Sequence, residues 1–218
     1  MSDINELIQK NRIWAARMVA GDPDFFGRLA RQQAPEYLWI GCADSRVPAN
    51  EIAGMMPGEL FVHRNVANLV VHSDLNCLSV MQYAVDVLKV KHIIVTGHYN
   101  CGGIIAALRN QSFGLIDNWL RHVQDVFHLH REEIEALDTE SRQVARLCEL
   151  NVLEQVVNVC RTTVVQAAWQ SGQELSVHGW VYDVKDGLVH SLVGPISDPA
   201  TALELHSSRL KRVKRGVA

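Results

Sequence analysis

Three short apolar runs punctuate the first half of the chain. They are "YLWIG" (37–41), "LFVH" (60–63) and "HIIVTG" (92–97). Stretches with helical character separate them, and the clearest of these is "DLNCLSVMQYAVDVLK" at 74–89. Near-continuous apolar strands that alternate with helices are typical of a parallel sheet whose two faces are both covered. The pattern therefore predicts an α/β fold with a mostly parallel central sheet and helices on both faces.

Both ends of the chain depart from this alternation. An apolar stripe at helical spacing near the start predicts a helical N-terminal arm over about 1–34, ahead of an α/β core over about 35–200. A long helical region is expected over about 140–170, and "ELSVHGWVYDV" and "LVHSLV" flank Gly187 as a predicted hairpin. The end, "RLKRVKR", predicts a solvated basic tail at about 207–218. No Pro/Gly/Ser-rich linker divides the chain, so residues 1–218 are expected to form a single domain.

Composition narrows the classes of partner. The 218 residues carry a formal net charge of -3, which gives no general attraction to nucleic acid or membrane. No apolar run approaches the roughly 20 residues that span a bilayer. The start, "MSDINELIQKNRIW", lacks the apolar region of a signal peptide. These observations predict a cytoplasmic protein with no nucleic-acid or membrane partner.

The five cysteines are the first candidates for chemistry. An odd number of cysteines without an export signal argues against a disulfide framework, and leaves packing, metal binding or catalysis. Cys77, Cys148 and Cys160 fall in predicted helices and are interpreted as packing residues. Cys42 and Cys101 follow predicted strands and need another explanation.

Chemically active side chains follow two of the apolar runs. Cys42, Asp44 and Arg46 come directly after the first run at a spacing of two, so they share one face if the strand continues through Arg46. His98 and Cys101, in "TGHYNCGG", come at the end of the third run. Because sites in open α/β sheets form at the carboxyl ends of the strands, both groups are expected at one edge.

Two thiolates and one imidazole at that edge suit zinc. With one open position such a set is typical of a catalytic site, whereas Asp44 as a fourth ligand makes a closed, structural one. Arg46 can hold Asp44 off the metal through a bidentate ion pair, which leaves Asp44 charged and able only to accept a proton. Gly102 and Gly103 are expected to begin a helix whose free N–H groups face an anionic product.

The motifs "CADSR" and "GHYNCGG" resemble those of the β-class carbonic anhydrases, and the bacterial enzymes most. The likeness runs from about residue 5 to about residue 205 and includes "FFGRLA", "GELFVHRNVANLV" and "LSVHGWVYDV". It implies reversible hydration of carbon dioxide to bicarbonate, a homodimer or homotetramer, and a parallel sheet with an antiparallel edge strand. Many relatives have Ser where this chain has Ala43, whose side chain is expected to point away from the site.

The resemblance also implies roles for individual residues. Zinc falls on Cys42, His98 and Cys101, with Asp44 as an exchangeable fourth ligand and Asp44–Arg46 as the pair that orients the nucleophile. Gln33 matches a glutamine that reaches the substrate from the neighbouring subunit. Val66 and Tyr83 match the wall of the substrate pocket, and Gly102 is expected there as the start of the helix that faces the product.

A second, allosteric site for bicarbonate is implied on Trp39, Arg64 and Tyr182. Without the resemblance, these are two core aromatics and a surface charge, and that interpretation stays open. Two alternatives for the whole protein also stay open. One is a related zinc hydrolase acting on another cumulated substrate such as carbon disulfide. The other is a non-enzymatic, zinc-stabilised binding protein in which Asp44 is always ligated.

Overall fold

The computed structural model describes residues 4–214 and divides after Ala34 into two compact units. The first unit, here called the arm, contains α1 (Ile4–Gly21) and α2 (Phe25–Arg31). No residue of α1 is buried, although the ring of Trp14 meets the edge of Phe26 at 5.7 Å. The rest of the chain, from Pro35, is here called the core unit.

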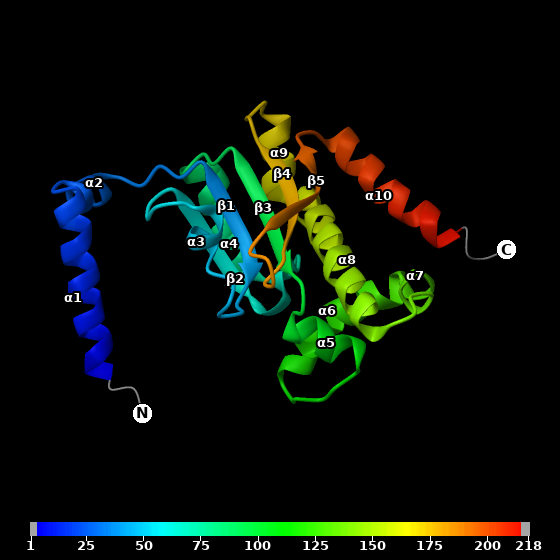
Figure 1. Cartoon of the computed structure of the whole chain (residues 1–218). Coiled ribbons are helices and arrows are strands. Elements are labelled where there is room, and N and C mark those ends of the chain that lie inside the picture. Colours follow the sequence, from blue (N-terminus) through cyan, green and yellow to red (C-terminus); the bar gives the residue numbers. More distant parts are fainter. Residues whose placement is uncertain (1–3, 215–218) are drawn as a thin grey trace. The chain divides into compact units, whose positions relative to one another are not determined.

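The core unit is built on a five-stranded sheet (Figure 1). Its order is β2 (Leu60–Asn65), β1 (Tyr37–Cys42), β3 (His92–His98), β4 (Ser176–Tyr182) and β5 (Val189–Ile196). The pairs β2–β1, β1–β3 and β3–β4 are parallel, and β5 is antiparallel to β4. This confirms the predicted α/β fold with its mostly parallel sheet and antiparallel edge strand. The β4–β5 hairpin turns at Gly187, whose φ of +76° is available to glycine at no steric cost.

The helical segments follow the strands in chain order. They are α3 (Ala49–Ala53), η1 (Val66–Asn68), α4 (Leu75–Gln82), the π-helical turn η2 (Tyr83–Val87), α5 (Gly102–Leu108), α6 (Ile116–Leu129), α7 (Arg131–Glu135), α8 (Glu140–Arg161), α9 (Thr163–Gln170) and α10 (Pro199–Lys214). The helical region predicted over 140–170 is two helices, because Thr162 adopts an extended backbone conformation and caps α9 by accepting from the N–H of Val165. None of the described helices is long and apolar enough to cross a membrane.

The predicted basic tail falls largely on the last helix. Residues 207–214 continue the backbone of α10, and residues 215–218 lie outside the described part of the chain.

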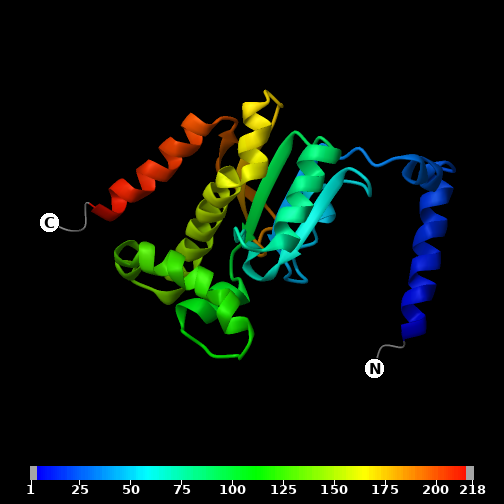
Figure 2. The ribbon, with the colours of Figure 1, turned by 180° about the vertical axis from the view of Figure 1, so that it is seen from behind.

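Alternation along β1 explains why helices cover both faces of the sheet. Leu38 and Ile40 point into a core shared with α4, α8 and α9, and Figure 2 shows the face that α4 and α8 cover. Trp39 points to the opposite face, where it packs with α3. Each fully buried Leu or Ile side chain contributes about 1.5–3 kcal/mol, so the run "YLWIG" stabilises both layers.

Strand register aligns the carboxyl ends of the sheet. Cys42 lies opposite Asn65, and His98 lies opposite Tyr182. The long helix α8 packs directly on the backbone below this edge, because a Cβ on Gly97 would lie only 2.5 Å from the side chain of Val152. The sheet and α8 together form a rigid base for the residues that follow β1 and β3.

Candidate metal centre

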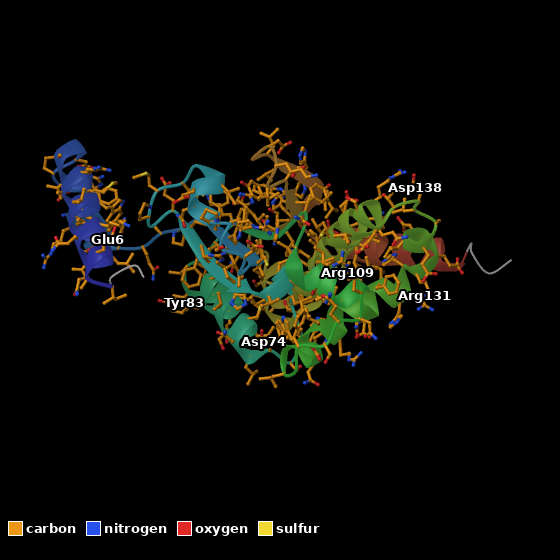
Figure 3. The ribbon with its side chains drawn as sticks, turned by 60° about the horizontal axis from the view of Figure 1, so that its bottom comes forward. Glu6, Asp74, Tyr83, Arg109, Arg131 and Asp138 are labelled. Atoms are coloured by element: carbon orange, nitrogen blue, oxygen red, sulfur yellow. The ribbon has the colours of Figure 1, made fainter. Side chains whose placement is uncertain are left out.

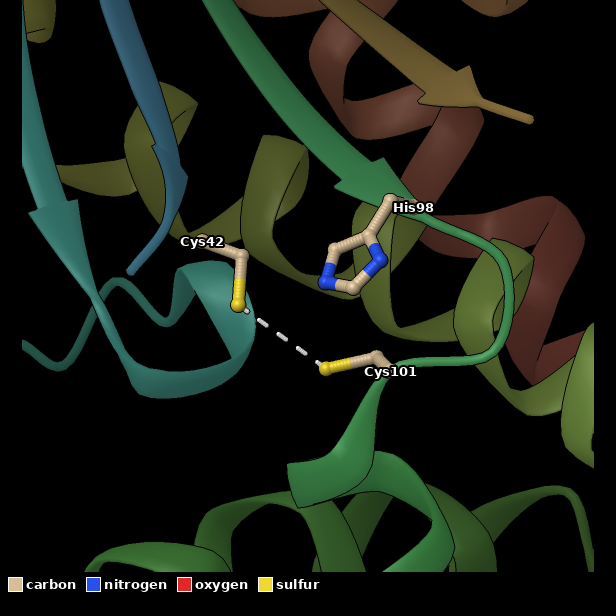
Figure 4. Close-up of side chains that lie close together, drawn as sticks. All are labelled: Cys42, His98 and Cys101. Atoms are coloured by element: carbon tan, nitrogen blue, oxygen red, sulfur yellow. Dashed lines mark hydrogen bonds between the residues drawn. The ribbon is translucent and has the colours of Figure 1, made fainter. Parts of the chain in front are cut away.

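Three side chains converge at the carboxyl edge of the sheet (Figure 4). Cys42 ends β1, His98 ends β3, and Cys101 precedes α5. The two sulfurs are 3.9 Å apart, and the three potential ligand atoms lie within 4.8 Å of one another. All three residues are buried. The structure therefore brings together the Cys₂His set that the sequence predicted.

The ring of His98 is held in the orientation that a metal ligand needs. Its Nδ1 lies 3.0 Å from the carbonyl oxygen of Tyr99, which can only accept, so Nδ1 carries the proton and donates it. Nε2 then has a lone pair, and it is buried without a hydrogen-bond partner in the structure. A buried, unpaired nitrogen beside two thiols is costly unless a cation binds there, so this donor set fits zinc.

The surroundings favour a thiolate at Cys42. The Cys101 thiol, followed by His98 and the backbone N–H groups of Asp44 and Ala67, lowers the pKa of Cys42 to about 4. Cys101 keeps its proton, and the neighbouring Cys42 and burial raise its pKa. The remaining cysteines differ: burial raises the pKa of Cys77, Cys148 and Cys160 to about 12. This separation agrees with their interpretation as packing residues.

A strained loop closes over Cys42. Ala67 and Asn68 in η1 have φ values of 65° and 47°, which for residues other than glycine cost on the order of 1–3 kcal/mol each. The loop is fixed from outside: Trp119 Nε1 donates to the carbonyl of Val66 at 2.8 Å, and Asn151 donates to that of Ala67 at 2.9 Å. These long-range hydrogen bonds hold the N–H of Ala67 toward the sulfur of Cys42.

Asp44 and Arg46 lie beside the three ligands, but they do not extend β1. The strand ends at Cys42 and the chain turns, with the N–H of Val47 donating to the carbonyl of Asp44 at 3.0 Å. The condition that the strand continue through Arg46 is therefore not met, and the strand gives way to a loop at Cys42. The turn forms because the Asp44 carboxylate accepts from the N–H two residues on, a local bond that competes with strand pairing.

The turn makes a bidentate ion pair. Arg46 Nε and Nη2 donate to Asp44 Oδ1 and Oδ2 at 2.9 and 2.7 Å. The Arg46 guanidinium holds the pKa of Asp44 well below its usual range, so the carboxylate is charged at neutral pH. Its Oδ2 lies 3.7 Å from the unpaired Nε2 of His98. Arg46 also reaches the carbonyl of Asn100 at 3.3 Å, which ties the pair to the loop carrying Cys101.

Arg64 braces the same turn, a role that sequence reasoning did not assign. Its Nε and Nη2 donate to the backbone carbonyls of Cys42 and Asp44 at 2.8 and 2.6 Å. Arg64 is exposed, as a surface charge would be, but its guanidinium is engaged by these two carbonyls. An arginine one residue before the end of β2 gave no local signal, because its partners lie at the end of β1 and in the turn that follows it.

The residues matched to the substrate pocket lie in different places. Val66 and Gly102 flank the metal centre, next to Cys101. Val66 packs against the start of α5, because a Cβ on Gly103 would lie 3.1 Å from its side chain. A Cβ on Gly102 would meet open space. Tyr83 lies elsewhere in the core unit, with its ring 5.9 Å from that of Phe61 near the amino end of β2. It is 44% exposed, and Figure 3 shows it well away from Arg109. Gln33 is exposed and belongs to the arm.

A cavity of about 660 Å³ opens on the outer side of the ion pair. Arg46, Asn100, Arg109 and Lys185 contribute to its wall, and none of the three potential metal ligands does. The guanidinium of Arg46 therefore faces the carboxylate on one side and this cavity on the other.

Trp39, Arg64 and Tyr182 project from one face of the sheet. In the register, Arg64 pairs with Gly41 and Gly41 pairs with Thr96, and paired residues point to the same face. Trp39 lies two residues before Gly41. Tyr182 pairs with His98, two residues after Thr96, so both share this face. Trp39 is 0% exposed and its Nε1 lacks a partner, as does the buried Oγ1 of Thr96. Thr96 is the one hydroxyl-bearing residue in the apolar run "HIIVTG". That departure from an apolar pattern was a signal for a buried polar group, and it was not used in the sequence-based prediction.

Comparison with known proteins places the chain in a family. A family profile described as "Carbonic anhydrase" matches residues 37–189. A carbonic anhydrase of Emericella nidulans is 50% identical over 188 residues, which are 86% of this chain and 82% of that protein. One from Pseudomonas aeruginosa is 36% identical over 180 residues, 78% of each chain. Of these two relatives, the fungal enzyme is thus more similar than the bacterial one, although the sequence was expected to look most bacterial.

Solved structures agree in fold as well as in sequence. The β-carbonic anhydrase of Coccomyxa, determined with acetazolamide, has a TM-score of 0.89 at 43% identity, covering 97% of this chain and 99% of that one. A tetrameric β-carbonic anhydrase of Sordaria macrospora has a TM-score of 0.85 at 39% identity, covering 88% and 98%. The profile spans most of the core unit, including all three potential metal ligands. The chain belongs to the β-carbonic anhydrase family.

Proposed function

We propose that this chain catalyses the reversible hydration of carbon dioxide to bicarbonate and a proton, with one Zn²⁺ held by Cys42, His98 and Cys101. The observation that carries the proposal is the unpaired, buried Nε2 of His98 between two sulfurs, with a charged carboxylate next to it. The relatives in the family are named carbonic anhydrases, which are lyases.

Each residue has a distinct task. Zinc bound there would supply a Lewis acid, which in carbonic anhydrase lowers the pKa of a bound water to about 7. Asp44 is charged and cannot donate, so it would accept a hydrogen bond from the attacking water or hydroxide and leave an oxygen lone pair toward the substrate. Val66 supplies an apolar wall for uncharged carbon dioxide, and the open space at Gly102 gives it room.

The exchange of Asp44 between Arg46 and the metal is part of the proposal. Its Oδ2 lies 3.7 Å from His98 Nε2, close to where a cation shared with the sulfurs would bind. Arg46 holds both carboxylate oxygens, which favours the open, catalytic arrangement. The alternative of a binding protein with Asp44 always ligated has no such support from the geometry.

We also propose that bicarbonate binds at Trp39, Arg64 and Tyr182 and favours the closed arrangement. The unpaired Nε1 of Trp39 and the guanidinium of Arg64 are donors that suit an anion. Arg64 already holds the carbonyls of Cys42 and Asp44, so an anion that draws it away loosens the turn that positions Asp44. The observable is cooperative inhibition by bicarbonate, which Trp39→Phe or Tyr182→Phe should weaken without changing zinc content. Unchanged inhibition in both variants contradicts this site.

A homodimer or homotetramer completes the proposed enzyme, with Gln33 reaching the site of a neighbouring chain and Tyr83 lining it. The support is the arm, in which no residue of α1 is buried and which exposes Ile4, Leu7, Ile8, Ile13 and Trp14. One related structure is described as tetrameric. Sedimentation analysis should find no monomer at micromolar concentration, and a stable active monomer contradicts the proposal. The cytoplasmic location stays a prediction.

The deciding experiment is stopped-flow hydration of carbon dioxide by the zinc-loaded protein across pH 6–9, with carbon disulfide as a second substrate. We expect hydration that rises with pH. A protein with one zinc per chain that does not hydrate carbon dioxide contradicts the proposal. Turnover of carbon disulfide in its place would identify the related hydrolase.

A further inference from the structure

A second cluster of metal-binding side chains lies at the opposite, amino edge of the sheet. It consists of His92, Ser176 and His178, on the adjacent strands β3 and β4, and is here called the amino-edge cluster. His92 Nδ1 and His178 Nε2 each lie 2.8 Å from Ser176 Oγ and 3.4 Å from each other. The two imidazole nitrogens therefore converge on one point.

Both rings are fixed by their surroundings. The ring of Tyr37 stacks on that of His92 at 5.2 Å with an interplanar angle of 20°. On the other side, β5 closes on His178, because a Cβ on Gly194 would lie 2.9 Å from its Nδ1. Rings that are already oriented lose little conformational entropy when they bind a ligand.

The spacing of the two nitrogens matches a shared metal ion. An ion 2.0–2.1 Å from each imidazole nitrogen separates the nitrogens by about 3.3 Å at a tetrahedral angle. The observed separation is 3.4 Å. We propose that His92 and His178 form a second, weaker site for a divalent transition-metal ion that favours imidazole ligands, such as Zn²⁺ or Ni²⁺, with water completing the coordination.

The state of the free cluster explains why this site is the weaker one. Burial, followed by the nearby His92, lowers the pKa of His178, so its ring is neutral and able to bind metal at pH 7. Ser176 Oγ can donate to only one of the two nitrogens and accepts from the N–H of the other. An ion must therefore displace both hydrogen bonds, the serine hydroxyl must rotate away, and one ring must change tautomer. The cost of those bonds sets the affinity below that of the Cys₂His centre. The proposal does not depend on the carbonic anhydrase activity.

The test uses untagged, zinc-loaded full-length protein and Ni²⁺ as the probe. Equilibrium dialysis against nickel, read out by elemental analysis for both metals, should show about one nickel per chain while zinc stays in place. His178→Gln and His92→Gln should each lower the nickel affinity at least about 10-fold, because each removes one of two protein ligands. His128→Gln and His190→Gln, at exposed positions, are the matched controls and should bind nickel as the parent does.

Two results overturn the proposal. One is a parent protein that binds no stoichiometric nickel with its zinc retained. The other is nickel binding in both His92→Gln and His178→Gln that equals the parent's. Retained zinc in a variant shows that it is folded, and two independent variants keep the test decisive if one of them fails to fold.

Discussion

The two ends of β3 carry similar side chains and reach different states. His98, at the carboxyl end, has a buried Nε2 without a partner, whereas His92, at the amino end, shares a hydroxyl with His178. The two positions are six residues apart, about 20 Å along a strand. At one end the imidazole nitrogen that faces the two sulfurs has no hydrogen-bond partner, while at the other end the same type of atom is satisfied within the protein.

The difference lies in what surrounds the imidazoles. At the carboxyl edge, the strained residue Ala67, the ion pair of Asp44 with Arg46 and the carbonyl of Tyr99 each lie beside one of the three potential metal ligands or next to the group. The folded protein therefore carries a cost that a bound cation removes, which is typical of a site built for tight binding. The amino-edge cluster carries no such cost, and an ion gains less by binding there.

The largest effect should follow loss of a sulfur ligand at the carboxyl edge. Cys101→Ala removes one of three ligands, so zinc should fall from about one per chain to near zero. Activity should fall by more than the 10–100-fold that loss of an outer partner costs. Elemental analysis and stopped-flow hydration measure both. Cys160→Ala is the matched control, since that thiol is buried with a pKa raised to about 12 in the core cluster that does not include the metal centre, and it should keep zinc and activity. Full zinc content in Cys101→Ala would sink the ligand assignment.

A second variant separates metal binding from catalysis at the same edge. Arg46→Ala frees Asp44 to compete for the metal, so activity should drop about 10–100-fold while zinc stays near one per chain. Asp44 is charged throughout pH 6–9, because its pKa lies well below its usual range, so the rise of activity in this window is not its own titration. The midpoint of that rise should move to higher pH in Arg46→Ala.

Arg142→Ala is the control for this variant, because its ion pair with Asp138 is exposed and such pairs contribute little. Equal losses of zinc and activity in Arg46→Ala would show that the arginine is structural.

A smaller effect should come from the residue that orients His98. The carbonyl of Tyr99 accepts a hydrogen bond from His98 Nδ1, and its phenol donates to Glu149 Oε1 at 2.7 Å. Arg146 holds Glu149 in turn by donating to its Oε2 at 2.6 Å. Tyr99→Phe removes this anchor and should speed the loss of zinc to a chelator about 10-fold. Glu149→Gln keeps an acceptor and should change the rate less. Asp138→Asn is the surface control, and a chelation rate equal to the parent's in Tyr99→Phe would contradict the anchoring role.

The sequence predicted those features that rest on local patterns. The apolar runs revealed β1, β2 and β3, and soft ligands at two strand ends predicted Cys42, His98 and Cys101 as the metal centre. Each apolar run and each ligand motif lies within about ten residues, where alternation and ligand chemistry can be recognised.

The features that the sequence did not reveal depend on contacts between distant segments. Arg64 reaches the backbone across a strand pair, and Tyr99 meets Glu149 from 50 residues away. The turn at Asp44 has a local cause that the apolar pattern alone does not show: a carboxylate that bonds its own backbone ends a strand without an apolar break.

The smallest predicted effect concerns the amino edge alone. His178 has a pKa below its usual value of 6.5, because it is half-buried and lies beside His92. The unfolded chain therefore binds a proton there before the folded protein does, and stability is lost as pH falls below about 6.5. His178→Gln removes this difference in proton binding between the folded and unfolded protein. Burial also lowers the pKa of His63, but that contribution is the same in the variant and the parent, so it cancels in the comparison. The variant should thus lose less unfolding free energy than the parent between about pH 7.5 and about pH 5.5. Urea unfolding should show a gap of about a few tenths of a kcal/mol, since solvent screens a half-buried group. Its zinc content and carbon dioxide hydration should match the parent's, because sites about 20 Å apart act independently. An altered metal content at the carboxyl edge would show that the two ends of the sheet are coupled.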